Sequence, residues 1–316
     1  MNFNGNVVLL VGGVGGAKLA HGLQSTLKPG QLTVIVNTGD DFWHYGLRIC
    51  PDLDTITYTL AGLVNKQTGW GVVGDTFTTL DTLRNYGEKP WFNLGDRDLA
   101  IHLMRTALWR RGLPLTAITA HLTAAVGVKC AVLPMTDEPV ETIVHTQEYG
   151  PLPFQEYFVK HRWQPTFSDM TLEGINDAFL TTDVRSAIEG ADVILIGPSN
   201  PWLSINPILS VPGMRELLRS RDVPKVAVTP IIEGRAIKGP TAKIMKELGL
   251  EVSARTVVEY YSDVITGFIY DERDTMLFHD HTDSIRFIAL DTLMDTEAKR
   301  MTFAHAVLSW ISDWTS

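Results

Sequence analysis

Short apolar runs recur along the chain, and each is followed within a few residues by glycine, proline or acidic side chains. Runs of this length and aliphatic or β-branched character are typical of buried strands. Four of them predict strands, at residues 7–11, 32–36, 192–196 and 224–228. A segment with helical character separates the members of each pair, at residues 17–23 and 213–221. Strand, helix and strand in succession form a βαβ unit, so the pattern predicts a parallel sheet.

The stretch between the second strand and residue 128 has mostly helical spacing. Helices are predicted there at residues 54–64, 75–86, 96–111 and 114–125. We therefore predict an α/β fold: a doubly wound, mostly parallel, Rossmann-like sheet with a largely helical insertion after the second strand. The chain is expected to form a single domain over residues 1–316, with a core at about 1–55 and 125–316 and the insertion at about 56–125.

The remaining segments give weaker patterns. Residues 131–135 and 141–146 are predicted to be the two strands of a hairpin. Residues 147–182 are polar and aromatic, and we interpret them as an excursion with a small sheet or helices of its own. Further helices are predicted at residues 241–249 and 296–311.

Composition narrows the function classes. The chain has 316 residues and a formal net charge of -9, without the basic stripe that nucleic-acid binders carry. No apolar stretch approaches the ~18 residues that a membrane span needs. Cys50 and Cys130 are the two cysteines, too few for a disulfide framework or a zinc pattern. The N-terminal residues 1–6 lack a basic region typical of a signal peptide, so a soluble, cytoplasmic protein is expected.

A glycine-rich segment follows the first predicted strand. It contains Gly13, Val14, Gly15, Gly16 and Lys18. The spacing fits neither a Walker A loop nor G-x-G-x-x-G. Successive glycines at a helix start still let backbone N–H groups approach a phosphate. The alternative is a tight turn that needs small residues only for packing.

Carboxylates gather after the second predicted strand. Asp40 and Asp41 follow it closely, and Asp52 and Asp54 come soon after. Such a cluster repels itself unless it is solvated or neutralised by a cation, and Mg²⁺ favours one or two carboxylates together with substrate phosphates. A solvated acidic loop with an aspartate helix cap is the alternative, and the spacing does not say which carboxylate binds metal.

Weaker candidates surround these two motifs. Trp43 stands in a predicted aromatic loop, where it is placed to stack on a planar ring. Asp96 is interpreted as a cap for the helix that follows it. Ser199 and Asn200 offer hydrogen-bonding groups at a strand end, and Lys238 precedes a glycine turn and a helix.

Taken together, these motifs resemble the 2-phospho-L-lactate transferases of deazaflavin coenzyme biosynthesis, the CofD/FbiA family. The resemblance covers nearly the whole chain. It rests on the segments GGVGGAK, NTGDD, HYGLRICPDLDT, LGDRDLA, LPMTDEPVET, ILIGPSNP and KGPTAK, in this order.

The resemblance implies a transferase that requires Mg²⁺. Such an enzyme moves a phosphorylated three-carbon acid from its guanosine diphosphate conjugate to the deazaflavin Fo, with GMP leaving, in coenzyme F(420) biosynthesis. It also implies a homodimer and an Fo contact at Asp54. Archaeal members often carry a basic residue where this chain has Asn93. The glycine segment looks like the bacterial form, which leaves phospholactate, enolpyruvyl phosphate and phosphoglycerate donors open.

On this basis we predict roles for individual residues. Asp40 and Asp54 are expected to be catalytic and to hold Mg²⁺, and whether Asp54 acts as a base or only orients Fo stays open. Fo is expected to contact Asp54, Asn93, Asp41 and Trp43. The nucleotide and its phosphates are expected to contact Gly13, Val14, Gly15, Gly16, Lys18, Ser199, Asn200 and Lys238. A UDP-sugar-binding regulator of the gluconeogenesis-factor-like family is the alternative function.

Overall fold

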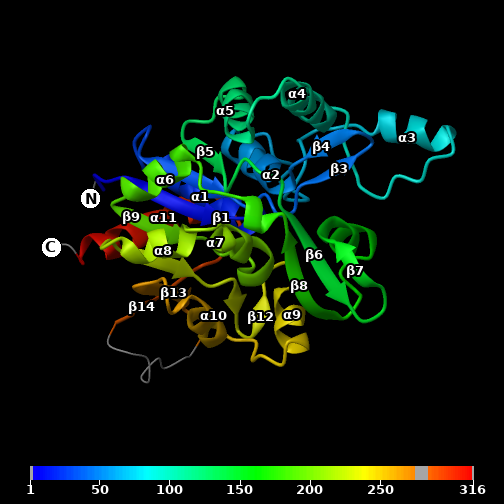
Figure 1. Ribbon diagram of the computed structural model, residues 1–316. Helices are drawn as coiled ribbons and strands as arrows, with labels where there is room; N and C mark the ends of the chain where they lie inside the picture. Colours follow the sequence, from blue (N-terminus) through cyan, green and yellow to red (C-terminus); the bar gives the residue numbers. More distant parts are fainter. Residues whose placement is uncertain (1–2, 275–283, 315–316) are drawn as a thin grey trace.

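The computed structural model describes residues 3–274 and 284–314, and its centre is a seven-stranded sheet with helices on both faces (Figure 1). The strand order is β14-β13-β10-β9-β1-β2-β5, and neighbouring strands pair in parallel. The strands are β1 (Val7–Val11), β2 (Leu32–Val36), β5 (Ala131–Pro134), β9 (Val193–Ile196), β10 (Lys225–Val228), β13 (Gly267–Asp271) and β14 (Arg286–Leu290). The predicted doubly wound parallel sheet is confirmed.

The strand order reverses next to β1. From β1 the chain adds β2 and then β5 on one side, whereas β9, β10, β13 and β14 follow one another on the other side. In open α/β sheets, ligands bind in the crevice outside the carboxyl ends of the strands at such a switch point. The fold therefore directs attention to the loops that leave β1 and β9.

Each face of the sheet is covered by helices, because β1 and its neighbours are apolar on both sides. Val7, Leu9 and Val11 pack toward α1 (Gly13–Thr26), α2 (Pro51–Leu60) and α11 (Glu297–Ser312). Val8 and Leu10 pack toward α6 (Thr182–Glu189), α7 (Asn206–Ser210), α8 (Met214–Ser220) and α10 (Ala254–Tyr261). This alternation is the two-sided burial expected of a central parallel strand.

The insertion between β2 and β5 contains a hairpin as well as helices. Besides α2, its helices are α3 (Thr78–Asn85), α4 (Asp98–Arg110) and α5 (Leu115–Ala125), close to the predicted bounds. The aromatic segment that we predicted to be a loop forms strands β3 (Phe42–His44) and β4 (Leu47–Ile49). Tyr45 and Gly46 both have positive φ, as a two-residue hairpin turn requires.

The predicted hairpin of residues 131–135 and 141–146 is wrong. β5 is buried and pairs in parallel with β2, which suits its apolar side chains. β6 (Glu141–Thr146) instead is the middle strand of a separate antiparallel sheet with β7 (Gly150–Pro153) and β8 (Phe167–Glu173), at the lower right of Figure 1. Residues 147–182 thus do contribute a small sheet of their own.

Short elements complete the described chain. They are π-helical turns at Glu156–Lys160 and Pro201–Ile205, a 3-10 turn at Ile175–Asp177, β11 (Ile231–Ile232), β12 (Arg235–Ala236) and α9 (Thr241–Glu247). Among the helices of residues 3–274 and 284–314, none has both the length and the apolar character needed to cross a bilayer.

Candidate functional site

A cavity of about 610 Å³ lies at the carboxyl ends of the central strands, at the switch point. Ten of the predicted site residues line it: Gly13, Val14, Gly15, Lys18, Asp40, Asp54, Asn93, Ser199, Asn200 and Lys238. Gly16 lies just behind this lining, packed on Val11. Asp41 and Trp43 line a second cavity instead. The motifs that lie far apart in the sequence therefore meet mainly around one space.

The glycine segment is the first turn of α1, and not the loop that we predicted, because the helix begins at Gly13 instead of residue 17. A Cβ on Gly12 would lie 2.5 Å from the Ser204 Cβ, and one on Gly15 would lie 2.4 Å from the Pro198 carbonyl oxygen. The glycines thus allow α1 to press against the loop after β9. The first N–H groups of a helix have no intrahelical partner, so this helix end is suited to an anion.

The loop after β9 is fixed to the glycine segment. The Gly12 N–H donates to Ser199 Oγ at 3.2 Å, and Ser199 Oγ donates to the Gly12 carbonyl at 3.3 Å. Asn200 Oδ1 accepts from the backbone N–H groups of Trp202 and Leu203, which starts the following helical turn. Its buried Nδ2 has no partner among the described residues, so this amide is available to a ligand in the cavity.

Positive charges gather beside this helix end. Burial lowers the pKa of Lys18, and the nearby charges of Lys238 and Arg300 lower it further, while Asp295 opposes them. Lys18 and Lys238 both line the cavity, and Lys238 Nζ donates to the Thr68 carbonyl at 3.4 Å. Cations that repel one another at a helix N-terminus form a site where a phosphate relieves the repulsion.

Two buried carboxylates face the same cavity. Asn37 Nδ2 donates to Asp52 Oδ2 at 3.0 Å, and the Asn37 side-chain oxygen accepts from the Gly39 N–H at 2.8 Å. Asp40 Oδ1 is buried without a hydrogen-bond partner among the described residues. Burial raises the pKa of Asp40 well above its usual value, and the charge of Asp52 raises it further. Burial also raises the pKa of Asp52 to about 6.

These residues fit a Mg²⁺ ion. Two neighbouring carboxylates, one with an unpartnered oxygen, need a cation to remain ionised together. No group of three or more His, Cys, Asp or Glu side chains in residues 3–274 and 284–314 is arranged to bind metal. Phosphate oxygens and water would have to complete the coordination, as is usual for Mg²⁺. The carboxylate beside Asp40 is Asp52, whereas the sequence had predicted Asp54.

Asp54 has a different partner. Arg105 NH1 donates to Asp54 Oδ2 at 3.2 Å, and NH2 donates to Oδ1, which makes a buried bidentate pair. Burial lowers the pKa of Arg105, but the charge of Asp54, its hydrogen bonds and the other nearby groups together raise it more, so the arginine stays charged. Both Asp54 oxygens are therefore occupied.

Three polar residues on α4 were not among the predicted site residues, although Asp98 belongs to the LGDRDLA segment that the sequence singled out. Asp98, His102 and Arg105 are buried, and their spacing of four and three residues puts them on one helix face. That spacing is the signal that could have found them. Tyr58 OH donates to Asp98 Oδ1 at 2.5 Å, and His102 Nε2 lies 3.3 Å from the same oxygen.

The predicted capping role of Asp96 is wrong for α4. Asp75 accepts from the N–H groups of Arg97 and Asp98 at 2.7 and 3.1 Å. Asp96 instead accepts from the N–H groups of Thr78 and Thr79 at the start of α3. It is thus a cap for the helix before it, which sequence order alone did not reveal.

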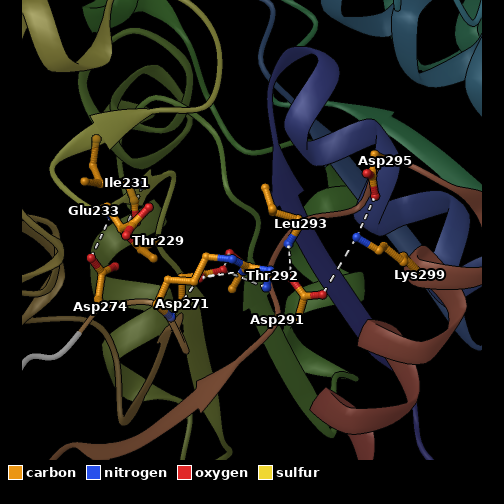
Figure 2. A network of polar contacts seen from close by, with 11 residues as sticks. Thr229, Ile231, Glu233, Asp271, Asp274, Asp291, Thr292, Leu293, Asp295 and Lys299 are labelled. Carbon is orange, nitrogen blue, oxygen red and sulfur yellow. Dashed lines mark hydrogen bonds and ion pairs between the residues drawn. The ribbon is translucent and has the colours of Figure 1, made fainter.

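A network at the ends of β13 and β14 holds another part of the cavity wall (Figure 2). The fully buried Asp271 accepts from Thr292 N–H at 3.0 Å, from Thr292 Oγ1 at 2.6 Å and from Arg273 NH1 at 2.8 Å. Arg273 NH1 also donates to Asp291 Oδ1 at 3.0 Å. On the left of Figure 2, Asp274 accepts from the Glu233 N–H at 2.7 Å. Because Thr292 lines the cavity, this network fixes the position of that wall.

The second cavity, of about 500 Å³, lies beside the β3–β4 hairpin. Arg48 NH2 lies 3.4 Å from Asp41 Oδ2. Burial raises the pKa of Asp41 to about 6, although Arg48 opposes the rise. Gln155 lines both cavities and donates to the Asp40 carbonyl at 3.2 Å. The residues predicted for Fo are thus divided, with Asp54 and Asn93 in the first cavity and Asp41 and Trp43 in the second.

Comparison with known proteins identifies the family. A family model described as 2-phospho-L-lactate transferase CofD matches residues 7–306. The chain is 39% identical over 309 residues to a 2-phospho-L-lactate transferase of Methanosarcina mazei, covering 96% of this chain and 99% of that protein. It is 42% identical over 281 residues to a phosphoenolpyruvate transferase of Thermobifida fusca, covering 85% and 87%.

The fold is shared more widely. The crystal structure of a UPF0052-family protein from Bacillus halodurans superposes with a TM-score of 0.63 at 16% identity, covering 96% of this chain and 100% of that one. This likeness shows a common architecture only. The family match and the identities above go further: the chain belongs to the 2-phospho-L-lactate transferase CofD family and is a transferase.

Proposed function

We propose that this protein transfers a phosphorylated three-carbon acid from its guanosine diphosphate conjugate to a hydroxyl of the deazaflavin Fo, releasing GMP, in coenzyme F(420) biosynthesis. The relatives named 2-phospho-L-lactate transferase and phosphoenolpyruvate transferase support this reaction class. The observation that carries the proposal is the single cavity in which a cationic helix end lies with an unneutralised pair of buried carboxylates.

The cationic side of the cavity is suited to the donor. The N–H groups at the start of α1 and the ammonium groups of Lys18 and Lys238 would bind the diphosphate. Asn200 Nδ2 would donate to the guanosine part, since it has no partner among the described residues. These contacts orient the phosphorus and disperse the negative charge that develops on the leaving GMP.

The carboxylate pair is suited to a metal. Asp40 and Asp52 would hold Mg²⁺, which when bound neutralises diphosphate charge and polarises its oxygens. Asn37 positions Asp52 by its hydrogen bond, and Gln155 positions the Asp40 backbone.

In the reaction, the acceptor oxygen forms a bond to the phosphorus that carries the three-carbon acid. The bond from this phosphorus to the bridging oxygen breaks, and GMP leaves with the electron pair. Transfers of this kind depend on alignment and charge neutralisation more than on covalent intermediates with the protein. Asn93 and Asp54 line the cavity, and both are proposed to bind the acceptor.

Product analysis tests the proposal. The purified protein, Fo, Mg²⁺ and each candidate guanosine diphosphate conjugate should give GMP and a phosphodiester of Fo whose mass identifies the three-carbon acid. Thermal shifts with GDP and with UDP-sugars separate the transferase from a UDP-sugar-binding regulator. Stabilisation by UDP-sugars alone, with no Fo product, would overturn the proposal. Light scattering tests the proposed homodimer.

A further inference from the structure

We propose that Asp98 is the catalytic base that accepts the proton of the attacking hydroxyl, with Tyr58 and His102 as positioning residues for its carboxylate. The inference rests on the proposed transfer to an alcohol. It concerns a cavity carboxylate, outside the pair assigned to the metal, that has an oxygen available to the acceptor.

Asp98 has one fixed oxygen and one available oxygen. Oδ1 accepts from Tyr58 OH at 2.5 Å and lies 3.3 Å from His102 Nε2. Oδ2 accepts no hydrogen bond from any residue of the described chain, and Asp98 lines the cavity. The carboxylate is therefore held on one side and open to a ligand on the other.

The tautomer of His102 follows from its second contact. His102 Nδ1 lies 3.0 Å from Arg105 NH1. A guanidinium only donates hydrogen bonds, so Nδ1 accepts and the ring proton is on Nε2, which faces Asp98. Arg105 in this way orients the imidazole, whose Nε2 lies 3.3 Å from Asp98 Oδ1 without a well-aligned hydrogen bond to it.

Asp54 is a poorer candidate for this role. Both of its oxygens accept from Arg105, and His102 Nδ1 lies 3.7 Å from Oδ2. Proton transfer to Asp54 would have to break a buried ion pair. Asp98 and Asp54 contact different ring nitrogens of the same imidazole, and both line the cavity.

The charge state of Asp98 agrees with a base. Burial raises the pKa of Asp98, but its contacts with His102 and Tyr58 lower it more, and the result is below the usual value. The carboxylate is then ionised at neutral pH. As the acceptor oxygen bonds to phosphorus, its proton passes to Asp98 Oδ2 and afterwards to water, while GMP carries away the electron pair of the broken P–O bond.

The test compares two asparagine variants that lie two residues apart, at the start of α4 and just before it. D98N should lower kcat at least about 100-fold, the range of general base catalysis, and change KM for the donor little. D96N is the matched control, because Asp96 lies outside the cavity lining and caps α3. It should lower the melting temperature but keep turnover. GDP binding with Mg²⁺, measured by calorimetry, should be unchanged in both variants.

Two further measurements separate catalysis from structure. Asp98→Ala should regain part of its turnover when sodium formate is supplied, which a structural role would not produce. Tyr58→Phe should lower kcat by several fold without weakening GDP binding. If D98N keeps turnover within about threefold of an active wild type, or if formate has no effect, the assignment of Asp98 is wrong. A wild type that makes no Fo product would instead overturn the proposed function itself.

Discussion

Replacing Arg105 tests how the site keeps Asp54 buried. Arg105 is fully buried and donates to both Asp54 oxygens and, at 3.3 Å, to the Arg48 carbonyl. Arg105→Met keeps much of the apolar stem but leaves the Asp54 charge unpaired. Breaking a buried ion pair by removing one partner costs about 3–5 kcal/mol.

That loss of unfolding free energy can be expressed as a decrease in the melting temperature. With ~2 cal/mol/K of unfolding entropy per residue, a chain of this length has an unfolding entropy of roughly 0.7 kcal/mol/K, so Arg105→Met should lower the melting temperature by about 5–8 °C. The double variant Arg105→Met, Asp54→Leu removes both charges and should recover most of the loss, because a buried pair is often no more stable than apolar residues of similar volume.

Differential scanning calorimetry or a chemical denaturation series measures both variants. The coupling energy comes from the double-mutant cycle, with Asp54→Leu as the third corner. Lys160→Met is a matched control, because Lys160 pairs with Glu156 on the surface, where ion pairs contribute about 0–1 kcal/mol. A loss below about 1 kcal/mol in Arg105→Met, or a double variant no more stable than the single one, would refute the reasoning.

Three further substitutions test separate parts of the site. Gly15→Val should weaken GDP binding by about tenfold or more in calorimetry while Fo binding is kept, because its Cβ would press on the loop after β9; unchanged GDP affinity would contradict this. Asp52→Asn should raise the Mg²⁺ concentration needed for half-maximal turnover by about tenfold, since Asp40 loses its neighbouring carboxylate; an unchanged Mg²⁺ titration would contradict it. Burial raises the pKa of Asp271, but hydrogen bonds from Thr292 and Arg273 together lower it more, so the pKa is lower in the folded protein than in the unfolded chain. The ionised carboxylate therefore stabilises the fold at a pH above the unfolded-state pKa. This stabilisation is lost as the pH falls through the folded-state pKa. The stability gap between wild type and Asp271→Asn should accordingly be largest near pH 7 and should shrink as the pH falls below the ordinary pKa of aspartate; a gap independent of pH would count against the network.

Local pattern was enough for the centre of the sheet. β1 and β2 are apolar at every position but one, so burial on both faces could be predicted without knowledge of their neighbours. β14 was missed because it is an edge strand with an arginine at its start and side chains that are only partly buried. The error at residues 131–146 has another cause: strand pairing depends on partners far along the chain, and β5 pairs with residues about one hundred positions earlier.

The candidate site, like the sheet, could be predicted only in part from the sequence. The positions of Asp40, Ser199 and Lys238 at one cavity follow from the rule that strand carboxyl ends meet at one sheet edge. The partner of each carboxylate could not be predicted from the sequence, because Asp54 pairs with a residue 51 positions away on a helix of the insertion. Sequence spacing locates such groups on a helix face, but only the tertiary structure decides that Arg105 on α4 reaches Asp54 on α2 and leaves Asp52 beside Asp40.

The partners of the buried carboxylates together explain why a metal is expected at one position only. Asp41 has Arg48, Asp54 has Arg105, and Asp98 has Tyr58 and His102. Asp40 and Asp52 have only an asparagine, a backbone N–H and each other among the described residues. Because a buried pair of like charges stays fully ionised only beside a cation, and no cation is among the partners of this pair in the described residues, we expect a cation from outside the chain to bind here. In the proposed function a Mg²⁺–diphosphate complex would supply it, and the ammonium groups of Lys18 and Lys238 in the same cavity would bind the diphosphate.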